Sequence, residues 1–273
     1  MSDIEFIFGG SFDPIHFGHL HIINSLQDLN LSWPVRILPC SVPALKKQTS
    51  ASFAQRVEMI QIALKDYHNV IVDRRESHRT GKSYSYDTLR ELAKEYPSRR
   101  FILVIGSDNL ETIGQWYQAK QLAKCCHLVV VDRPDNSVEQ QQALLTDLGF
   151  RAVTSHLELA EVPSGLFYHY KIIERDTSST AIRDSLRGSR IESDAGNVGS
   201  KNESCTQNGS RKQNSLTVSN AGSESCTNDL AQQSQNIALT SRDNKTASQM
   251  IDALNIETPV AVKDYIINHS IYT

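Results

Sequence analysis

Two histidines, His16 and His19, stand within the stretch GGSFDPIHFGHL, which runs from Gly9 to Leu20. They are three residues apart, so on a helix they share one face and both rings reach the same bound group. Two imidazoles beside exposed backbone amides can donate hydrogen bonds to phosphate oxygens as charge develops in a transition state, without a covalent intermediate. Gly18 lies between them and leaves room for a nucleotide over the helix. The spacing therefore predicts phosphoryl or nucleotidyl transfer.

The same residues allow simpler interpretations. A single histidine in a helix is usually a surface or capped core residue, and a single pair of glycines is usually a turn. The joint pattern of strand, Gly-Gly, Asp-Pro and His-x-Gly-His is much rarer, and chance accounts for it about one time in twenty. A zinc site of His16, His19 and His21 is a further alternative. At 100° per residue His21 points away from the other two, so we expect no metal site here.

The strand before the motif and the helix within it must position these histidines. Ile4 to Phe8 is a short apolar run with side chains on both faces, as in a strand buried in a parallel sheet. Gly9 and Gly10 end this strand and let a ligand approach the backbone closely. Asp13 and Pro14 predict an N-cap and a first helical position, so we expect a helix from Pro14 to about residue 29. Its exposed amides and positive dipole end would form an anion site.

The rest of the chain alternates strand and helix. Strands are predicted over 35–40, 70–73, 101–105 and 128–132, an extended segment over 152–162, and helices over 53–67, 86–96 and 138–148. This alternation predicts a Rossmann-like α/β fold, a single domain with a doubly wound parallel sheet and ligands at the carboxyl ends of the strands.

A second polar motif, TSSTAIR, covers residues 177–183. Hydroxyl residues at a helix start offer side-chain and backbone donors together, and Arg183 lies three residues after Thr180, on its face. Such a cluster can hold the β- and γ-phosphates that leave as pyrophosphate. Simple helix capping would use the same residues.

Two landmarks lie between the motifs. Asp108 follows the most apolar strand, where its carboxylate can accept hydrogen bonds from a ribose diol or cap a short helix. Trp116 and Tyr117 come eight residues later in a polar context. A tryptophan flat against a pyridinium ring gains stacking and electrostatic attraction, whereas core packing is the favoured interpretation of a tryptophan taken alone.

Together these residues resemble a known family. The stretch GGSFDPIHFGHL is similar to the signature of the His-x-Gly-His nucleotidylyltransferase superfamily, and its form is most similar to bacterial nicotinate-nucleotide adenylyltransferases. Residues 177–183 resemble the family's Ser-Ser-Thr-x-Ile-Arg, with Thr177 in place of the usual isoleucine. The resemblance spans roughly residues 1–188 and about the last fifteen. It implies transfer of AMP from ATP to nicotinate mononucleotide in NAD biosynthesis, giving deamido-NAD and pyrophosphate, with Mg²⁺ carried by the nucleotide.

The resemblance also implies roles for individual residues. The two histidines would be catalytic, stabilising charge at the α-phosphorus of ATP. Contacts to ATP are implied for Gly9, Gly10, Ser11, Phe12, His16, Gly18, His19, Gly106, Asp108, Ser178, Ser179, Thr180 and Arg183. Contacts to nicotinate mononucleotide are implied for Lys46, Lys47, Ser83, Tyr84, Ser85, Trp116, Tyr117 and Arg133, with the tryptophan against the nicotinate ring.

Two loops depart from the family pattern. Ala44 and Leu45 stand where Pro-His is expected, so one of the two following lysines is a candidate phosphate contact, against the alternative of a solvated charge pair. Ser85 stands where the family has threonine. The stretch RTGKS over 79–83 ends like a P-loop, but Glu76 occupies the position of the required glycine, so we reject that interpretation.

Composition limits the partners and the compartment. A net charge of -3 and a pI near 6.3 argue against nucleic acid as a partner. The five cysteines lack metal-ligand spacing, and Cys125 and Cys126 are expected to pack as small apolar groups. No apolar run approaches membrane-spanning length, and the chain enters its first strand by Ile4 without a signal peptide. We therefore expect a cytoplasmic protein without a membrane partner; its oligomeric state stays open.

The composition changes abruptly after Gly188. Residues 189–248 are rich in Ser, Asn, Gln and Thr and have no apolar period, so we predict a disordered, low-complexity insertion. It separates a nucleotidylyltransferase domain over 1–188 from a helical segment over 249–273 that completes this domain. In that segment Thr258 and Pro259 predict an N-cap and a first helical position, and Val262 and Ile266 lie on one apolar stripe.

Three alternatives to this function remain open. The acceptor could be nicotinamide mononucleotide, phosphopantetheine or that of a cytidylyl system, although the tryptophan and the Ser83-Tyr84 loop favour a pyridine. The protein could be a non-catalytic pyridine-nucleotide sensor, against which both motif histidines are intact. It could also be a scaffold that works through its insertion, which we rank last.

Overall fold

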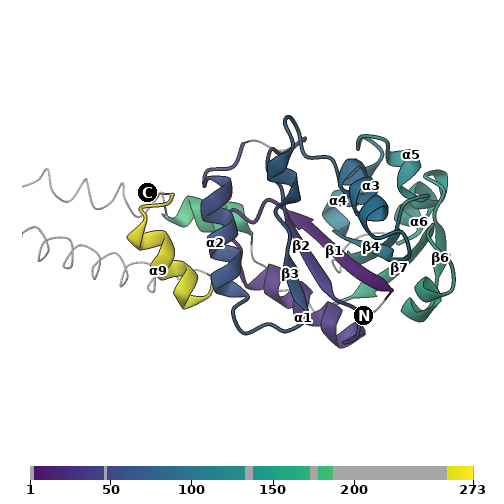
Figure 1. The fold of residues 1–273 in the computed structure, drawn as a ribbon, viewed down its shortest axis with the longest axis horizontal. Helices are drawn as coiled ribbons and strands as arrows, with labels where there is room; N and C mark the ends of the chain where they lie inside the picture. The colour runs from purple at the N-terminus through teal and green to yellow at the C-terminus, as the bar shows by residue number, and fades with distance from the viewer. Residues whose placement is uncertain (1–2, 46–47, 133–137, 173–177, 187–256, 273) are drawn as a thin grey trace, which may run out of the picture. The chain divides into compact units, whose positions relative to one another are not determined.

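The core of the structure is a seven-stranded, wholly parallel sheet (Figure 1). The computed structural model describes residues 3–45, 48–132, 138–172, 178–186 and 257–272. The strands lie in the order β3-β2-β1-β4-β5-β7-β6, which confirms the predicted doubly wound α/β fold. Their bounds are β1 (Ile4–Gly10), β2 (Val35–Pro39), β3 (Val70–Val72), β4 (Arg100–Gly106), β5 (His127–Asp132), β6 (Arg151–Val153) and β7 (Leu166–Lys171).

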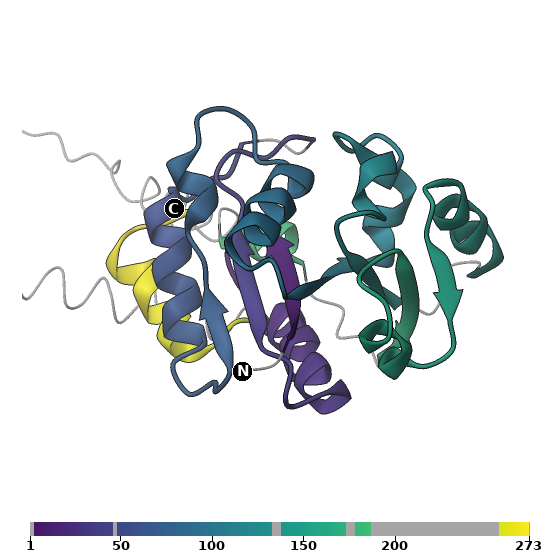
Figure 2. The same ribbon diagram turned by 45° about the vertical axis from the view of Figure 1, so that its right-hand side comes forward.

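Helices connect the strands, and one compact unit includes residues 1–184 and 257–272. The views agree that α9, near the C-terminus, lies beside α2, far away in the sequence (Figures 1 and 2). None of the described helices combines the length and the apolarity that crossing a bilayer requires. The helices are α1 (Phe17–Leu29), α2 (Phe53–Ala63), η1 (Arg75–His78), α3 (Ser85–Glu95), α4 (Ser107–Ile113), α5 (Ala119–Leu122), α6 (Val138–Asp147), η2 (His156–Ala160) and α9 (Val260–Asn268).

Strand β1 is buried on both faces, although the charged residue Glu5 interrupts its apolar run. Ile7 belongs to a cluster with apolar residues of α3, α4, α5 and α6. Phe6, which points to the opposite face, packs against Trp33 with ring centroids 5.4 Å apart. Cys126 is fully buried in the cluster of Ile7, and Cys125 packs against it, which confirms that both pack as apolar groups. The sheet is therefore a rigid support for the loops at its carboxyl edge.

The first helix begins later than the sequence pattern indicates. Its N-cap is His16 and its first residue is Phe17, so the prediction of an Asp13 cap and a start at Pro14 is wrong. The carboxylate of Asp13 accepts hydrogen bonds from the backbone amides of Ser50 at 2.8 Å and Ala51 at 3.0 Å. Because these partners belong to the loop before α2, Asp13 joins two loops and does not cap a helix.

The chain after α6 also differs from the prediction. Strand β6 ends at Val153 and a 3₁₀ helix follows, so the extended segment predicted over 152–162 is wrong beyond its first residues. Ser155 accepts a hydrogen bond from the amide of Leu157 and caps this helix. The strand missed by the sequence analysis is β7, which lies between β5 and β6.

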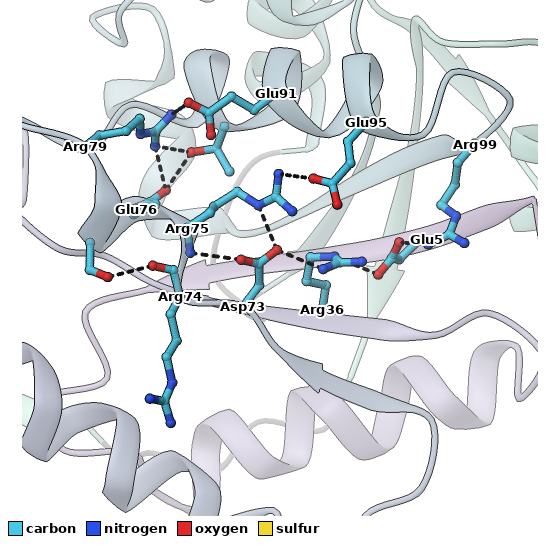
Figure 3. Close-up of polar contacts among 12 residues, drawn as sticks. Glu5, Arg36, Asp73, Arg74, Arg75, Glu76, Arg79, Glu91, Glu95 and Arg99 are labelled. Carbon is cyan, nitrogen blue, oxygen red and sulfur yellow. Dashed lines mark hydrogen bonds and ion pairs between the residues drawn. The ribbon is translucent and has the colours of Figure 1, made fainter.

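A chain of buried ion pairs ties the first strands to η1, and half-exposed pairs continue from η1 to α3 (Figure 3). Glu5 on β1 accepts hydrogen bonds from Arg36 at 2.8 Å and from Arg99 at 2.7 Å. Arg36 also donates to Asp73 at 2.8 Å, and Asp73 accepts from Arg75 of η1 at 2.7 Å. Buried charges persist only when they are paired this way. The network holds η1, and through it the loop that leads to residues 83–86, against the sheet.

Candidate active site

Two adjoining cavities open at the carboxyl edge of the sheet, where a doubly wound fold places its ligands. The first, called here the histidine cavity, has a volume of about 640 Å³ and is lined by both motif histidines, Asp108 and the 178–183 motif. The second, called the aromatic cavity, has a volume of about 460 Å³ and is lined by Tyr84, Tyr86, Trp116 and Tyr117. Both share the lining residues Phe8, Gly9, Gly10, Ser11, Gly106 and Asn109.

The two histidines lie together at the start of α1. The ring centroids of His16 and His19 are 3.8 Å apart with an angle of 34° between the planes, and the amide of His16 donates to His19 Nδ1 at 3.3 Å. The His19 ring also lies 4.9 Å from the ring of Phe12, a buried residue with a left-handed φ of 48°. The predicted shared face is therefore confirmed, although His16 caps the helix from outside its first turn.

Burial determines the charge of His16. Its side chain is 6% exposed, and this desolvation lowers its pKa from 6.5 to about 4. The imidazole is therefore neutral at physiological pH. Its Nδ1 has no hydrogen-bond partner among the described residues. A neutral ring with a vacant nitrogen can take a hydrogen bond or accept a proton when a charged group arrives.

Backbone carbonyls of the turn before α1 are hydrogen-bonded by side chains from distant parts of the chain. Arg56 of α2 donates to the carbonyl of residue 11 at 2.6 Å, and Arg183 donates to that of residue 13 at 2.6 Å. Ser179 donates to the carbonyl of residue 14 at 3.0 Å, and Thr258 to that of residue 15 at 2.7 Å. The prediction that Thr258 is the N-cap of the last helix is therefore wrong. Pro259 holds that position.

The second motif contributes hydroxyls and a cation to the histidine cavity. Residues 179–186 are helical, and the amide of Ala181 donates to Ser178 Oγ at 3.1 Å, which is the expected cap. Arg183 also donates to Thr180 Oγ1 at 3.1 Å, so the predicted shared face of these two residues is confirmed. Ser178 therefore both caps this helix and lines the histidine cavity, so the two interpretations of the motif are compatible.

Asp108 lies in the first turn of α4, and Gly106 is the N-cap of that helix. Asp108 Oδ1 accepts a hydrogen bond from the side chain of Asn109 at 3.3 Å, so the alternative that Asp108 itself caps the helix is wrong. A Cβ atom placed on Gly106 would lie 2.5 Å from Asp108 Oδ1. Only glycine at 106 therefore leaves this carboxylate where it is, in the lining of the histidine cavity.

Aromatic rings in mutual contact form one wall of the aromatic cavity. Tyr84 and Tyr117 have ring centroids 4.7 Å apart, and Tyr86 approaches Tyr117 edge-on at 6.1 Å. Ser83 holds the opposite loop, since its amide donates to the carbonyl of Val42 at 2.8 Å. Trp116 both lines this cavity and packs against the main core. The two interpretations of the tryptophan, ring stacking and core packing, are thus compatible.

The structure gathers the sequence-predicted site residues into these two cavities. All thirteen residues expected at ATP line the histidine cavity, and Ser83, Tyr84, Ser85, Trp116 and Tyr117 line the aromatic cavity. Lys46, Lys47 and Arg133 lie outside the described residues.

The cavities also contain residues that sequence reasoning missed. His21, which the helical angle had directed away, lines the histidine cavity with Gln48, Thr49, Asn109, Val131 and Ile172. Lys82 and Glu76 line the aromatic cavity, and the Lys82 ammonium donates to the carbonyl of Ala44 at 3.3 Å. Lys82 lies in the stretch RTGKS, and its cation could have marked it as a candidate contact. The sequence analysis rejected a P-loop there and did not consider this lysine separately. Within the described residues, no three His, Cys, Asp or Glu side chains gather into a metal-binding group.

Comparisons with known proteins agree with this geometry. The model of the cytidylyltransferase-like family matches residues 7–185. A probable nicotinate-nucleotide adenylyltransferase of Methylococcus capsulatus is 35% identical over 186 residues, which cover 67% of this chain and 88% of the relative. The chain belongs to the cytidylyltransferase-like family. A second such relative, from Marinobacter nauticus, is 34% identical over 185 residues and 86% of its length.

A solved structure supports the fold of this cytidylyltransferase-like protein. The nicotinic acid mononucleotide adenylyltransferase of Plasmodium falciparum, complexed with NaAD, superimposes with a TM-score of 0.53 at 21% identity. The match covers 67% of this chain and 83% of that one. The family model ends at residue 185, so α9 and the residues around it lie beyond the matched region.

Proposed function

We propose that this protein transfers the AMP group of ATP to nicotinate mononucleotide, giving deamido-NAD and pyrophosphate. One observation carries the proposal: a polar cavity with two histidine rings in contact opens into an aromatic cavity, and both share Gly9, Gly10 and Gly106. A donor and an acceptor bound in the two cavities would meet over the end of β1. The curated relatives that match two thirds of the chain carry the name of this activity.

The reaction itself needs no protein nucleophile. An oxygen of the acceptor's 5′-phosphate attacks the α-phosphorus of ATP, a new P–O bond forms, and the bond to the bridging oxygen of the leaving pyrophosphate breaks. His16 and His19 would donate hydrogen bonds to the α-phosphate as its charge grows. Their contact fixes both rings before the substrate arrives, and preorganised donors cost no reorganisation during the reaction.

The second motif suits the leaving group. Ser178, Ser179, Thr180 and Arg183 would hold the β- and γ-phosphates, since hydroxyls and a guanidinium bind phosphate oxygens by charge-assisted hydrogen bonds. Asp108, in the lining of the histidine cavity, would accept hydrogen bonds from a ribose diol. Ser11 and Phe12 would line the triphosphate path.

Mg²⁺ would enter with the nucleotide. Asp13, a carboxylate of the histidine cavity, is already engaged by backbone amides, and the described residues hold no group of three metal ligands. These residues fit a metal that is coordinated mainly by phosphate oxygens and water, as Mg²⁺ usually is. When bound, the ion supplies positive charge to the triphosphate, while the chain's own residues orient it.

The aromatic cavity suits a pyridine mononucleotide. Trp116, Tyr84 and Tyr117 offer aromatic surface for a pyridinium ring. Ser83 and Ser85 would supply polar contacts beside it. The acceptor's phosphate would meet Lys82 or one of the lysines 46 and 47, with Arg133 as a further contact.

Pyrophosphate release tests this function directly. We expect rapid release from ATP and Mg²⁺ with nicotinate mononucleotide and at least tenfold slower release with nicotinamide mononucleotide or phosphopantetheine. Release with one of the other two acceptors alone would move the function to that acceptor. Absence of release with all three would contradict the proposal.

A further inference from the structure

The turn that carries His16 is fastened by a segment beyond the family match. Residues 257–272 contact it at three points. The amide of Phe17 donates to the carbonyl of residue 257 at 3.0 Å, Thr258 Oγ1 donates to the carbonyl of residue 15 at 2.7 Å, and the Tyr272 hydroxyl donates to Asp13 Oδ1 at 2.7 Å. Both side-chain contacts are buried.

Asp13 is the centre of this arrangement. Its two carboxylate oxygens accept hydrogen bonds from the amides of Ser50 and Ala51 and from the phenol of Tyr272, and the Arg183 guanidinium lies 3.8 Å away. The side chain is 5% exposed. With three donors already bound, this carboxylate joins the turn to the loop before α2 and to the C-terminal segment.

The backbone around both ends of this contact adopts unusual conformations. Phe12, next to Asp13, has a φ of 48°, and Tyr272 has a φ of 70°. Non-glycine residues rarely occupy this left-handed region and persist there only when the surrounding contacts require it. Ile271 and Tyr272 are nonetheless buried, so the last described residues turn back into the protein. Burial and the bond to Asp13 also raise the pKa of Tyr272, which keeps its phenol a hydrogen-bond donor.

These contacts control where the carbonyl oxygens of the turn point. The carbonyl of residue 13 accepts a hydrogen bond from Arg183, that of residue 14 from Ser179, and that of residue 15 from Thr258. A carbonyl oxygen carries partial negative charge and repels phosphate. A donor on each oxygen keeps it from turning toward a triphosphate, and it fixes the peptide that leads into His16.

We propose that Thr258 and Tyr272 are positioning residues for nucleotidyl transfer: they hold the turn 13–17 so that His16 and His19 face the α-phosphate. The inference rests on the proposed function. Neither side chain lines the histidine cavity, so both act through the turn and touch no substrate. A displacement of catalytic groups by about 1 Å can cost a hundredfold in rate.

The test separates turnover from binding. Tyr272→Phe and Thr258→Val each remove one hydroxyl with little change in volume. We expect kcat to fall about 10- to 30-fold in each variant, with the KM for ATP and for nicotinate mononucleotide within about threefold of wild type. Thr258→Ser keeps the donor and is expected to restore kcat to within about twofold.

Tyr265→Phe is the matched control. It makes the same substitution in α9, at a tyrosine whose ring stacks on His269 at 4.1 Å, away from the turn. Kinetics are measured where melting curves show every variant folded. Equal kcat values for Tyr272→Phe, Thr258→Val and this control would overturn the inference, as would equal losses for Thr258→Ser and Thr258→Val. If Tyr272→Phe fails to fold, the Thr258 pair decides alone. A wild type without pyrophosphate release would instead overturn the proposed function, and this inference with it.

Discussion

The two cavities share the end of β1 but are built in different ways. Hydrogen-bonding groups line the histidine cavity, and segments more than 150 residues apart in sequence hold them through hydrogen bonds. Rings from two short segments, 84–86 and 116–117, form the wall of the aromatic cavity. Hydrogen bonds depend on direction, whereas apolar contact does not. This difference fits the proposed roles, in which the histidine cavity would stabilise changing charge and the aromatic cavity would recognise a flat ring.

The largest effect is expected from His19→Ala. Removing a preorganised donor to the reacting phosphate should lower kcat about 1000-fold while the KM for nicotinate mononucleotide stays within about threefold. The measurement is steady-state pyrophosphate release, with His78→Ala, an exposed histidine of η1, as the control. A His19→Ala variant that keeps a tenth of wild-type turnover would show that the histidine cavity does not hold the reacting group.

Acid should destabilise the fold in part through His16. Burial lowers the pKa of His16 to about 4, below its ordinary 6.5, so the unfolded chain takes up this proton first as the pH falls. The stability that depends on neutral His16 is complete above about pH 6.5 and decreases toward pH 4, by about 2 kcal/mol at pH 5. Denaturant unfolding at pH 7 and pH 5 measures the loss.

His16→Gln supplies the contrast for this prediction, because glutamine does not titrate. We expect the variant to lose about 2 kcal/mol less than wild type between the two pH values. His127, also buried and with its pKa lowered to about 4, stays in both proteins and contributes equally. Identical losses would mean that His16 is already exposed to water in the folded protein.

Trp116→Ala should affect the aromatic cavity alone. Loss of the stacking surface is expected to raise the KM for nicotinate mononucleotide about 10- to 30-fold, with the KM for ATP within about twofold. The ATP value serves as the internal control for folding, because Trp116 also packs against the core. An equal increase in the KM values for both substrates would contradict the proposal that the two cavities bind different substrates.

The smallest effect is expected from deleting residues 189–248. The described linings of both cavities come from other parts of the chain, and loop length contributes weakly to closure entropy. Turnover with both substrates should stay within about threefold of wild type in the same pyrophosphate assay. A folded deletion variant without activity would show that this segment takes part in the reaction.

The features that the sequence predicted correctly depend on residues close together in the chain. His16 and His19, and likewise Thr180 and Arg183, are three residues apart, so helical geometry places each pair together. The alternation of strands and helices likewise determined the fold class. Such local patterns are readable in one chain without its structure.

Contacts between residues far apart in the sequence could not be predicted from it. Asp13 looked like a helix cap because its neighbour is proline, but its decisive partner is Tyr272, 259 residues away. His21 lines the histidine cavity although the helical angle turns it away from His19, because the cavity extends beyond the face that the two motif histidines share. Strand β7 was missed because its place between β5 and β6 follows from tertiary packing. The roles of Lys46, Lys47 and Arg133 stay predictions.

In the proposed function, ATP and a pyridine mononucleotide react across the shared end of β1. The most direct measurement follows the label of ATP carrying ³²P at the α-phosphate, in the presence of Mg²⁺ and nicotinate mononucleotide. The account predicts that label appears in a dinucleotide with the mass of deamido-NAD, in amounts equal to the pyrophosphate released. Pyrophosphate without a labelled dinucleotide, or label that stays in ATP, would contradict it.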